Sequence, residues 1–400
     1  MVKLLLIADD FTGALDSSIF FAGRGAPTAV QFRPQFSWDD VSEDTEVLAV
    51  NSASRHLPPE EAAACVRELV LEARRRGIGM IFKKVDSALR GNVGSELEAV
   101  LESAEGKELF LLPAYPGGGR ATVGGVQLWN GVPISDTAYR HDPREPVVES
   151  NVKAILRRQT SVPISEVSER ERIGENGGIL VLDAADNRHI LQRCREILQR
   201  SSPILIGGCA GIADALADCL YPHGEERTVH HSGLPLLVVS GSMHPVSAEQ
   251  MAYGRQSGLP YHTLRGKVEL QEDFVCSDEG RGRIAEIRRE LTEKRTVLLE
   301  TACDTPLCGK RDDAVSRQIA ALVEAVYDPN APFALAVFGG DTLLEIASRL
   351  FTGGLFPQYE VEPGVPLALV KDKSGHTLPL ISKSGGFGTK TVIDEIRKRY

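Results

Sequence analysis

The stretch "KLLLIADDFTGALDSS", residues 3–18, decides the fold of the N-terminal half of this chain. Its apolar run, 4–8, is typical of a buried strand, and residues 12–22 are typical of the helix that follows such a strand. Ligands of α/β proteins bind at strand-to-helix turns of this kind. This turn holds Asp9 and Asp10 instead of the glycines of a phosphate site, and two carboxylates repel an anion. The sequence therefore predicts an α/β fold whose first turn binds hydroxyl groups and not phosphate.

The composition indicates a globular protein of two domains. The chain has 400 residues, which exceeds the size at which one hydrophobic core usually stops growing. Its net charge of −10 disfavours a nucleic-acid surface, because neutralising phosphates requires clustered Lys and Arg. The sequence has no signal-peptide pattern and no apolar stretch of about 18 residues, so we expect neither secretion nor a membrane span.

The seven cysteines are scattered and odd in number, which fits reduced thiols in a cytoplasmic protein. The pair in "CDTPLC", residues 303–308, has the wrong spacing for a zinc knuckle, and no cluster of His and Cys occurs elsewhere. We therefore expect a cytoplasmic location and no metal site formed by a direct motif.

Strand-like and helix-like patterns alternate along the chain, which predicts two α/β domains with mainly parallel sheets and a cleft between them. Polar and turn-forming residues interrupt the pattern at "YPHGEERTVHHSG", 221–233, so we expect domains at 1–225 and 233–400. In the first domain, strands are expected at 2–8, 28–32, 46–51, 80–85, 109–113, 179–183 and 203–206, and helices at 12–22, 59–76, 93–103, 151–158, 187–200 and 211–220. In the second, strands are expected at 234–240, 296–301, 333–338, 367–370 and 378–382, and helices at 244–256, 281–294, 312–327, 342–350 and 390–398.

The stretch "PAYPGGGRATVGGVQLWNGVPI", residues 113–134, fits neither pattern. It is rich in glycine and proline and is too irregular for a strand or a helix. Long loops inside a compact domain tend to be functional or mobile, so we expect a loop of that kind here.

Three glycine-rich turns follow predicted strands in the second domain: "VVSGSMHP" at 238–245, "VFGGDTLL" at 337–344 and "ISKSGGFGTK" at 381–390. Glycine lets the backbone approach an anion, Ser and Thr add hydroxyl donors, and the following helix N-termini favour negative charge. Turns at the carboxyl ends of parallel strands share one crevice. Together they predict a nucleotide phosphate site, although none matches the standard phosphate loop or the dinucleotide fingerprint. Glycine in any one of them has the alternative interpretation that it only makes the turn.

The first domain carries charged and hydroxyl side chains at further strand ends, in "FKKVDSALRGN", residues 82–92, and "NSASRHLPPEEA", residues 51–62. Such groups suit a small polyhydroxylated acid, because Lys or Arg binds its carboxylate and carboxylates accept hydrogen bonds from its hydroxyls. The alternative to substrate binding is that Asp86 and Arg90 form an ion pair that contributes little to stability and that Arg55 is solvated. The candidate substrate-binding residues are Asp9, Arg55, Lys83, Lys84, Ser87 and Arg90.

These pieces together resemble the four-carbon acid sugar kinase family, which includes threonate, erythronate and oxo-tetronate kinases. The resemblance covers almost the whole chain in matching order, and the set is specific although each piece is short. It implies an N-terminal domain that binds the sugar acid, a C-terminal domain that binds ATP, and phosphate transfer to the terminal hydroxyl. The stretches that carry it are "ADDFTGALD" at 8–16, "KKVDSALRGN" at 83–92, "PAYPGGGRATVGG" at 113–125, "FGGDT" at 338–342 and "PLISKSGGFGTK" at 379–390.

Phosphoryl transfer mainly requires positioning and charge neutralisation. We expect backbone N–H groups of the glycine-rich turns to hold the ATP phosphates, with Lys383 and Mg²⁺ offsetting their charge. An aspartate then accepts the proton of the attacking hydroxyl, and the sequence leaves two catalytic candidates. Basic neighbours keep Asp86 ionised, whereas repulsion between Asp9 and Asp10 leaves one of them, with Asp10 the candidate, a better base. The expected ATP-binding residues are Ser242, Gly339, Gly340, Asp341, Thr342, Lys383, Ser384, Gly385 and Gly386.

The first nucleotide turn departs from the family pattern, in which Gly-Ser-Cys-Ser is followed by a Thr. Here it reads Gly241-Ser242-Met243-His244 with Ser247, so the contact of Ser242 carries over and the role of His244 stays open.

Two other functions also stay open. A non-catalytic sugar-acid or nucleotide sensor is disfavoured because a pure binder does not require a base, and an NAD-dependent hydroxy-acid dehydrogenase would carry the fingerprint after its first strand. The substrate's stereochemistry and the oligomeric state are not encoded in these motifs, although a homodimer is the commonest arrangement.

Overall fold

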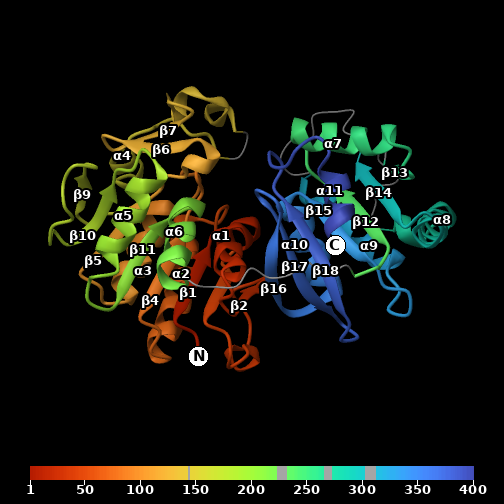
Figure 1. Cartoon of the computed structure of the whole chain (residues 1–400), viewed down its shortest axis with the longest axis horizontal. Coiled ribbons are helices and arrows are strands. Elements are labelled where there is room, and N and C mark those ends of the chain that lie inside the picture. Colours follow the sequence, from red (N-terminus) through yellow and green to blue (C-terminus); the bar gives the residue numbers. More distant parts are fainter. Residues whose placement is uncertain (143–144, 223–231, 265–272, 302–311) are drawn as a thin grey trace. The chain divides into compact units, whose positions relative to one another are not determined.

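The computed structural model describes residues 1–142, 145–222, 232–264, 273–301 and 312–400. It divides into two compact units, Met1–Glu226 and Arg227–Tyr400 (Figure 1). Each unit is an α/β domain with a mainly parallel sheet, which confirms the predicted fold class. Most of the interrupted stretch 221–233 lies outside the described residues, and so does the "CDTPLC" pair of cysteines. The described cysteines are free, and no described helix is long and apolar enough to cross a membrane.

The first unit is built from parallel strands connected mainly by helices. The strands lie side by side in the order β2-β3-β1-β4-β11-β5-β10-β9, and every neighbouring pair is parallel. They are β1 (Leu4–Ala8), β2 (Thr28–Gln31), β3 (Val47–Asn51), β4 (Met80–Lys84), β5 (Glu108–Leu112), β9 (Ile164–Val167), β10 (Gly178–Leu182) and β11 (Ile204–Gly208). The helices are α1 (Phe11–Gly23), α2 (Pro59–Arg75), α3 (Val93–Ser103), α4 (Val152–Leu156), α5 (Asn187–Ile197) and α6 (Ala210–Leu220).

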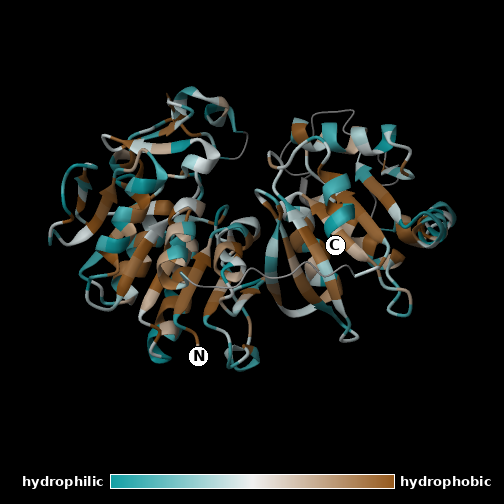
Figure 2. Cartoon of the chain, in the orientation of Figure 1, coloured by the Kyte–Doolittle hydropathy of each residue, from teal (hydrophilic) through white to brown (hydrophobic). Residues whose placement is uncertain are grey.

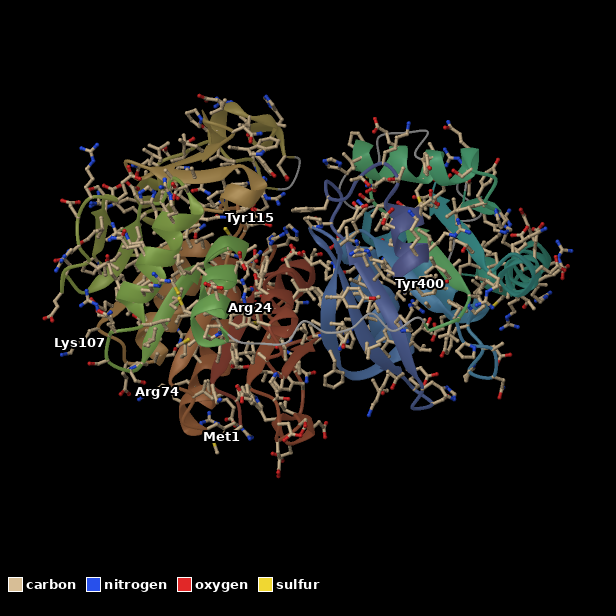
Figure 3. All side chains as sticks on the ribbon, in the orientation of Figure 1. Met1, Arg24, Arg74, Lys107, Tyr115 and Tyr400 are labelled. Atoms are coloured by element: carbon tan, nitrogen blue, oxygen red, sulfur yellow. The ribbon has the colours of Figure 1, made fainter. Side chains whose placement is uncertain are left out.

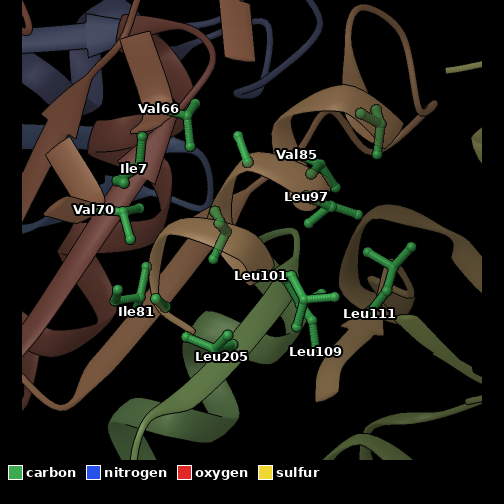
Figure 4. Close-up of a cluster of buried hydrophobic side chains, with 14 of the residues drawn as sticks. Ile7, Val66, Val70, Ile81, Val85, Leu97, Leu101, Leu109, Leu111 and Leu205 are labelled. Atoms are coloured by element: carbon green, nitrogen blue, oxygen red, sulfur yellow. The ribbon is translucent and has the colours of Figure 1, made fainter. Parts of the chain in front are cut away.

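Helices cover both faces of this sheet. α1, α5 and α6 pack together on one face, and α2, α3 and α4 pack on the other (Figure 1). Because neither face meets water, the strands are nearly continuous apolar runs, which Figure 2 shows in brown. Figure 4 shows the apolar cluster that α2 and α3 bury against the sheet. Leu97 of α3 is fully buried there, near Val85, Leu109 and Leu111.

The strand order brings the ends of β1, β3 and β4 together. β1 lies between the other two, and Ala8 pairs with Asn51 on one side and with Lys84 on the other. Since the strands are parallel, the segments that follow them leave the sheet at the same edge. Figure 3 labels a residue at each end of β5: Lys107 precedes the strand, and Tyr115 lies beyond its carboxyl end, on the side of this edge.

The glycine-rich stretch 113–134 is not the irregular loop that we expected. It contains a short antiparallel meander with the order β6-β7-β8, whose strands of two to four residues give no readable periodicity. Asp183 accepts hydrogen bonds from both backbone N–H groups of the β6–β7 turn, and Gln127 donates to the carbonyls of Ser87 and Pro113. These contacts fasten the meander over the carboxyl edge of the sheet. Its strands are β6 (Arg120–Val123), β7 (Val126–Trp129) and β8 (Val132–Pro133).

The second unit combines a parallel and an antiparallel part. Its strands lie in the order β13-β14-β12-β15-β18-β17-β16, and the steps from β18 to β17 and from β17 to β16 are antiparallel. The strands are β12 (Leu236–Ser240), β13 (Tyr261–Leu264), β14 (Thr296–Thr301), β15 (Ala334–Phe338), β16 (Phe351–Glu362), β17 (Val365–Asp372) and β18 (Thr377–Lys383). The helices are α7 (Pro245–Gln256), α8 (Asp278–Lys294), α9 (Asp312–Val326), α10 (Gly340–Leu350) and α11 (Val392–Arg399).

Most predicted elements are confirmed to within a few residues, whereas β9, β13 and β16 were not predicted. β9 and β13 have four residues each, too few for a clear pattern. β16 contains Gly353, Gly354 and Pro357, which are unfavourable in strands, and its pairing with β17 shifts register at several points. Short 3₁₀ helices complete the fold at Trp38–Asp40, Pro116–Gly118, Ile134–Asp136, Ala138–His141 and Phe274–Cys276.

Replacing Leu97 by Ala should destabilise the chain, because the lost side chain leaves a cavity between α3 and the sheet. We expect the free energy of unfolding to fall by about 3 kcal/mol, measured by urea titration. The matched control is Leu71→Ala, since Leu71 of α2 is 37% exposed and its truncation leaves no cavity. Equal losses for the two variants would contradict the core described here.

Candidate functional site

Arg55 lies between two carboxylates at the end of β1. Its Nε and Nη2 donate to the two oxygens of Asp9 at 2.6 and 3.0 Å, and its Nη1 donates to Asp10 Oδ2 at 2.9 Å. A third carboxylate, that of Asp86, lies 3.8 Å from Nη2. The sequence predicted that Arg55 would bind the substrate's carboxylate. In the structure, its guanidinium binds the protein's own aspartates.

The two aspartates of this turn differ in their surroundings. Burial acts to raise the pKa of Asp9, but the charges of Arg55 and Lys83 outweigh it, and the pKa is lowered. The cation between Asp9 and Asp10 thus offsets the repulsion expected from the sequence. The Asp10 side chain is 30% exposed, against 3% for Asp9. Asp10 also caps α1, since its Oδ1 accepts a hydrogen bond from Gly13 N at 2.8 Å.

Asp86 is bound on both oxygens by Arg90. Arg90 Nε donates to Oδ2 and Nη2 donates to Oδ1, each at 2.9 Å, and the backbone N–H of Ala88 donates to Oδ2 at 3.1 Å. Burial acts to raise the pKa of Asp86, but the hydrogen bond from Arg90 and the charges of Arg55 and Arg90 bring it far below its usual range. Arg90 Nη1 also donates a hydrogen bond to Asp142 Oδ2 at 2.8 Å. Asp86 is therefore held as an ion inside a buried network.

The two consecutive lysines of β4 point to opposite faces of the sheet, as successive strand residues do. Lys83 is fully buried and forms an ion pair of 3.0 Å with Glu96 of α3. Burial raises the pKa of Glu96, which also accepts a short hydrogen bond from the Ser54 hydroxyl. Lys84 points toward α1, where its Nζ would lie 2.5 Å from a Cβ on Gly13. Lys83 is therefore a structural ion-pair partner, and Lys84 is the lysine beside the aspartates.

Asn92 fixes the segment that carries Arg55. Its Nδ2 donates to the carbonyls of Ser54 and Leu57 at 3.0 and 2.8 Å. On the other side, the backbone N–H groups of Ser54 and Arg55 both donate to the carbonyl of Asp9. The loop after β3 is thus clamped between the turn after β1 and the start of α3.

Arg120, Tyr139 and Asp142 join this site although sequence reasoning did not select them. The Arg90 and Arg120 guanidinium carbons lie 5.4 and 5.7 Å from the centre of the Tyr139 ring, and Arg120 donates to the Tyr139 hydroxyl. The Arg120 guanidinium also stacks on Trp129. The signal for Arg120 was its place in the glycine-rich stretch, whereas nothing in the sequence marked the other two.

The glycine-rich turns of the second unit come together, because β12, β15 and β18 are neighbours in the sheet. A Cβ on Gly339 would stand 3.3 Å from Ser242 N, and one on Gly385 would stand 2.9 Å from Ser242 Oγ. A Cβ on Gly241 would overlap Thr342 Oγ1. Gly339 has a φ of 117°, a left-handed backbone that side chains rarely adopt. Backbone and hydroxyl groups of all three turns therefore lie close together at the carboxyl ends of β12, β15 and β18, as the sequence predicted.

The N-terminus of α10 offers backbone donors at this place. No side chain caps the helix, so the N–H groups of Gly340, Asp341 and Thr342 have no partner within it. The N–H of Gly339 is different, because it donates to the carbonyl of Lys383 at 3.0 Å. The free donors thus begin one residue later than we expected.

Lys383 is turned into the protein. Its Nζ donates to Ser247 Oγ at 3.1 Å and to the carbonyls of Ser384 and Gly385 at 3.1 and 3.0 Å, and it lies 4.8 Å from the centre of the Phe338 ring. Burial lowers its pKa to about 8. The Lys383 side chain therefore holds the backbone of the third turn in place through these hydrogen bonds.

His244 connects the first and third turns. Its Nδ1 accepts a hydrogen bond from Val246 N at 3.2 Å and so caps α7. That bond leaves the proton of the neutral ring on Nε2, which would lie 3.4 Å from a Cβ on Gly386. Burial and the charge of Lys383 lower the pKa of His244, which favours this neutral form.

Two family models match the chain, one for each unit. The model of a sugar-binding N-terminal domain matches residues 4–216, and the model of a nucleotide-binding C-terminal domain matches residues 237–393. The chain therefore belongs to the family that joins these two domains, the four-carbon acid sugar kinase family. Acceptor groups thus gather in the unit that matches the sugar-binding model, and backbone donors gather in the unit that matches the nucleotide-binding model.

Curated relatives match over nearly their whole length. A D-threonate kinase of Salmonella typhimurium is 28% identical over 98% of this chain and 97% of its own. A D-erythronate kinase of Heliobacterium modesticaldum is 24% identical over 97% and 94%, and a 3-oxo-tetronate kinase of Brucella melitensis is 24% identical over 99% and 95%. These names support a phosphotransferase function and the resemblance noted in the sequence.

Solved structures share the fold. A Salmonella typhimurium protein described as a putative tRNA synthase has a TM-score of 0.84 at 20% identity and full coverage of both chains. Haemophilus influenzae protein HI1011 has a TM-score of 0.76 at 20% identity, covering 98% of this chain and 99% of its own. At this identity, the likeness shows the fold alone.

Replacing Asp86 by Asn should destabilise the protein at neutral pH, and by a smaller amount at pH 3. The lowered pKa values of Asp9 and Asp86 mean that their stabilisation is fully present above the unfolded pKa, about 3.9, and is lost as the pH falls below it. We expect the variant to lose about 3 kcal/mol at pH 7, because it breaks a buried ion pair. Urea titrations at pH 7 and pH 3 measure the difference, with Asp39→Asn as the exposed control. An equal loss at both pH values would contradict the ion pair.

Replacing Lys383 by Met should flatten the alkaline dependence of stability. A lysine whose folded pKa is lowered to about 8 is neutral in the folded chain between pH 8 and about 10.4 while it is still charged in the unfolded chain. The wild-type contribution should therefore increase as the pH rises through this window and decrease as it falls toward 8. Urea titrations at pH 7.5 and 9.5 compare the two proteins. If the free energy of unfolding changes equally with pH in the two proteins, the pKa of Lys383 is not lowered in the folded chain.

Proposed function

We propose that this protein is a kinase that transfers the γ-phosphoryl group of ATP to the terminal hydroxyl of a four-carbon sugar acid. The observation that carries the proposal is the opposite polarity of the two sites. Asp9, Asp10 and Asp86 gather at the sheet edge of the first unit, where carboxylates accept hydrogen bonds from hydroxyls. Glycine-rich turns and an uncapped helix N-terminus gather in the second unit, an arrangement that suits phosphates.

We infer that Asp10 is the general base. Arg90 occupies both oxygens of Asp86 and keeps its pKa far too low for it to accept a proton. Asp9 is only 3% exposed, so a substrate hydroxyl cannot reach it. Asp10 is the most exposed of the three, so a bound hydroxyl can reach it, while Gly13 N and Arg55 fix its orientation. Asp9, Arg55, Asp86 and Arg90 then act by holding Asp10 and the substrate hydroxyls in place.

The nucleotide site is proposed at the glycine-rich turns. The N–H groups of Gly340, Asp341 and Thr342, with Ser242 and the turn 384–386, would hold the phosphates. Lys383 supports this turn instead of reaching the nucleotide, and His244 Nε2 adds a donor beside it.

Mg²⁺ fits as an ion that arrives with ATP. Among the described residues, no group of three or more His, Cys, Asp and Glu could hold a resident metal. A nucleotide-bound Mg²⁺ takes most ligands from phosphates and water and requires only one or two carboxylates. The exposed Asp341 at the start of α10 would supply one. Bound there, the ion would neutralise charge on the phosphates.

The homodimer that the sequence left open stays a prediction. A Bordetella bronchiseptica relative, 26% identical with a TM-score of 0.50, covers 99% of this chain and 98% of its own and is described as a domain-swapped dimer with bound citrate. That description supports an oligomer in this family.

The direct test is release of ADP from ATP and Mg²⁺ with D- and L-threonate, D- and L-erythronate and their 3-oxo forms. We expect turnover with one or more of these acids. Asp10→Asn should lower kcat by about 10²- to 10⁴-fold with little change in KM, because it removes a general base. Asp39→Asn, on an exposed side chain far from the cluster in sequence, is the control.

Two outcomes would contradict the proposal in different ways. Binding of an acid and ATP without ADP release would favour a sensor. Wild-type kcat in Asp10→Asn, with turnover otherwise normal, would move the base to another residue.

A further inference from the structure

Gln250 of α7 is a fully buried amide that donates to three consecutive backbone carbonyls. Its Nε2 lies 3.0 Å from the oxygen of Phe387, 3.1 Å from that of Gly388 and 2.9 Å from that of Thr389. The Oε1 atom of Gln250 is also buried, and no described residue donates a hydrogen bond to it. Because an unsatisfied buried oxygen is costly, the favourable contribution of this side chain comes from its donors.

Two further buried side chains hold the first half of the same turn. Lys383 Nζ donates to the carbonyls of Ser384 and Gly385. Ser247, which lies one helical turn before Gln250 on α7, donates from Oγ to the carbonyl of Gly385 at 3.0 Å and accepts a hydrogen bond from Lys383 Nζ. We call Ser247, Gln250 and Lys383 the carbonyl clamp, because together they bind carbonyls along the whole turn.

The carbonyl clamp determines where the N–H groups of the turn point. The peptide bonds here are trans, and in a trans peptide unit the N–H of one residue points opposite to the carbonyl of the residue before it. The clamp therefore turns away from itself the N–H groups that follow the bound carbonyls, which are those of Gly385, Gly386, Gly388, Thr389 and Lys390. The N–H of Thr389 donates to Glu362 Oε2 at 2.6 Å, whereas the others donate to no residue that the structure describes. Donors on both sides of Thr389 thus remain available to a ligand.

The unused donors begin beside the other glycine-rich turns. A Cβ on Gly385 would stand 2.9 Å from Ser242 Oγ, and one on Gly386 would stand 3.4 Å from His244 Nε2. Gly388 has a φ of 78°, and a Cβ there would stand 3.3 Å from Gln250 Nε2. Backbone N–H groups that are held together in one turn form a concavity that binds anions. The carbonyl clamp therefore acts on donors at the place proposed for the phosphates.

We propose that Gln250 positions the third turn for the nucleotide and extends its anion site from Gly385 and Gly386 to the N–H groups of Gly388 and Lys390. This inference rests on the proposed kinase function and adds a residue that itself touches no ligand. Without the amide of Gln250, the second half of the turn loses the donors that fix it before ATP arrives. The cost of ordering the turn then falls on binding.

The first test compares Gln250→Met with Gln256→Met, the same substitution at an exposed glutamine of the same helix. Methionine has nearly the length of glutamine but no N–H donor. For Gln250→Met, we expect the KM for ATP to rise about 10- to 100-fold, the effect of losing a hydrogen bond to a charged group, with an unchanged KM for the tetronate. Gln256→Met should match the wild type in both constants.

A second pair of variants tests the backbone donor directly and does not disturb the core. Lys390 is exposed, and it precedes the first residue of α11, so a proline is tolerated there. Lys390→Pro removes the side chain and the N–H, whereas Lys390→Ala removes the side chain alone. We expect the KM for ATP to be about tenfold higher in the proline variant than in the alanine variant. This pair keeps the proposal testable should Gln250→Met fail to fold.

Several results would overturn the inference. An unchanged KM for ATP in Gln250→Met would exclude the positioning role, and an equal rise in the KM for ATP and for the tetronate would show a general loss of structure. Equal KM values for ATP in Lys390→Pro and Lys390→Ala would exclude the N–H of Lys390 as a phosphate donor.

Calorimetric titration with ATP in the absence of any acid separates this inference from the proposed function. Absence of turnover in the wild type would refute the kinase. Weaker binding of ATP by Gln250→Met, with binding of adenosine unchanged, would still support the phosphate-positioning role, because adenosine has no phosphate for the turn to bind.

Discussion

The Arg55 guanidinium connects the turn after β1 with the loop after β3. Asp9 is almost fully buried, so its charge is tolerated only beside a counter-ion, and Arg55 provides that charge with two hydrogen bonds. The backbone repeats the connection, since the N–H groups of Ser54 and Arg55 donate to the Asp9 carbonyl. Asp10 follows directly in the chain, and its Oδ2 accepts a hydrogen bond from the same guanidinium, which fixes its position. The defined orientation of the Asp10 carboxylate thus results from an ion pair whose main role is structural.

The two units use one architecture for opposite chemistry. In each, turns at the carboxyl ends of parallel strands form the site, as the geometry of open parallel sheets dictates. The difference lies in a few residues: Asp9 and Asp10 follow β1, whereas Gly339 and Gly340 follow β15. Carboxylates present acceptors, and bare backbone presents donors. Function therefore follows from the residues in the turns more than from the fold that carries them.

The sequence predicted the alternating elements because buried parallel strands are apolar and their helices are long enough to show a period. It failed at β6 to β8, whose short antiparallel strands gain their stability from contacts such as those of Asp183 and Gln127. It also selected charged residues at the strand ends without revealing their partners. Arg55 and Lys383 were expected to meet ligands, and both are occupied within the protein. Residue type and position along a strand are visible in a sequence, whereas the group that satisfies a charge is a long-range property of the fold.

The neighbouring lysines of β4 have a consequence for how this strand can vary. One supports the core through Glu96, and the other faces the aspartates, and only the two-residue repeat of the strand separates these roles. A deletion of one residue within β4 would turn Lys84 toward α3 and place Val85 beside the aspartates, and an insertion would place Phe82 opposite Glu96. Substitutions elsewhere along β4 can be absorbed by repacking, but a change in its length cannot. The count of residues between Met80 and Asp86 is therefore itself under structural constraint.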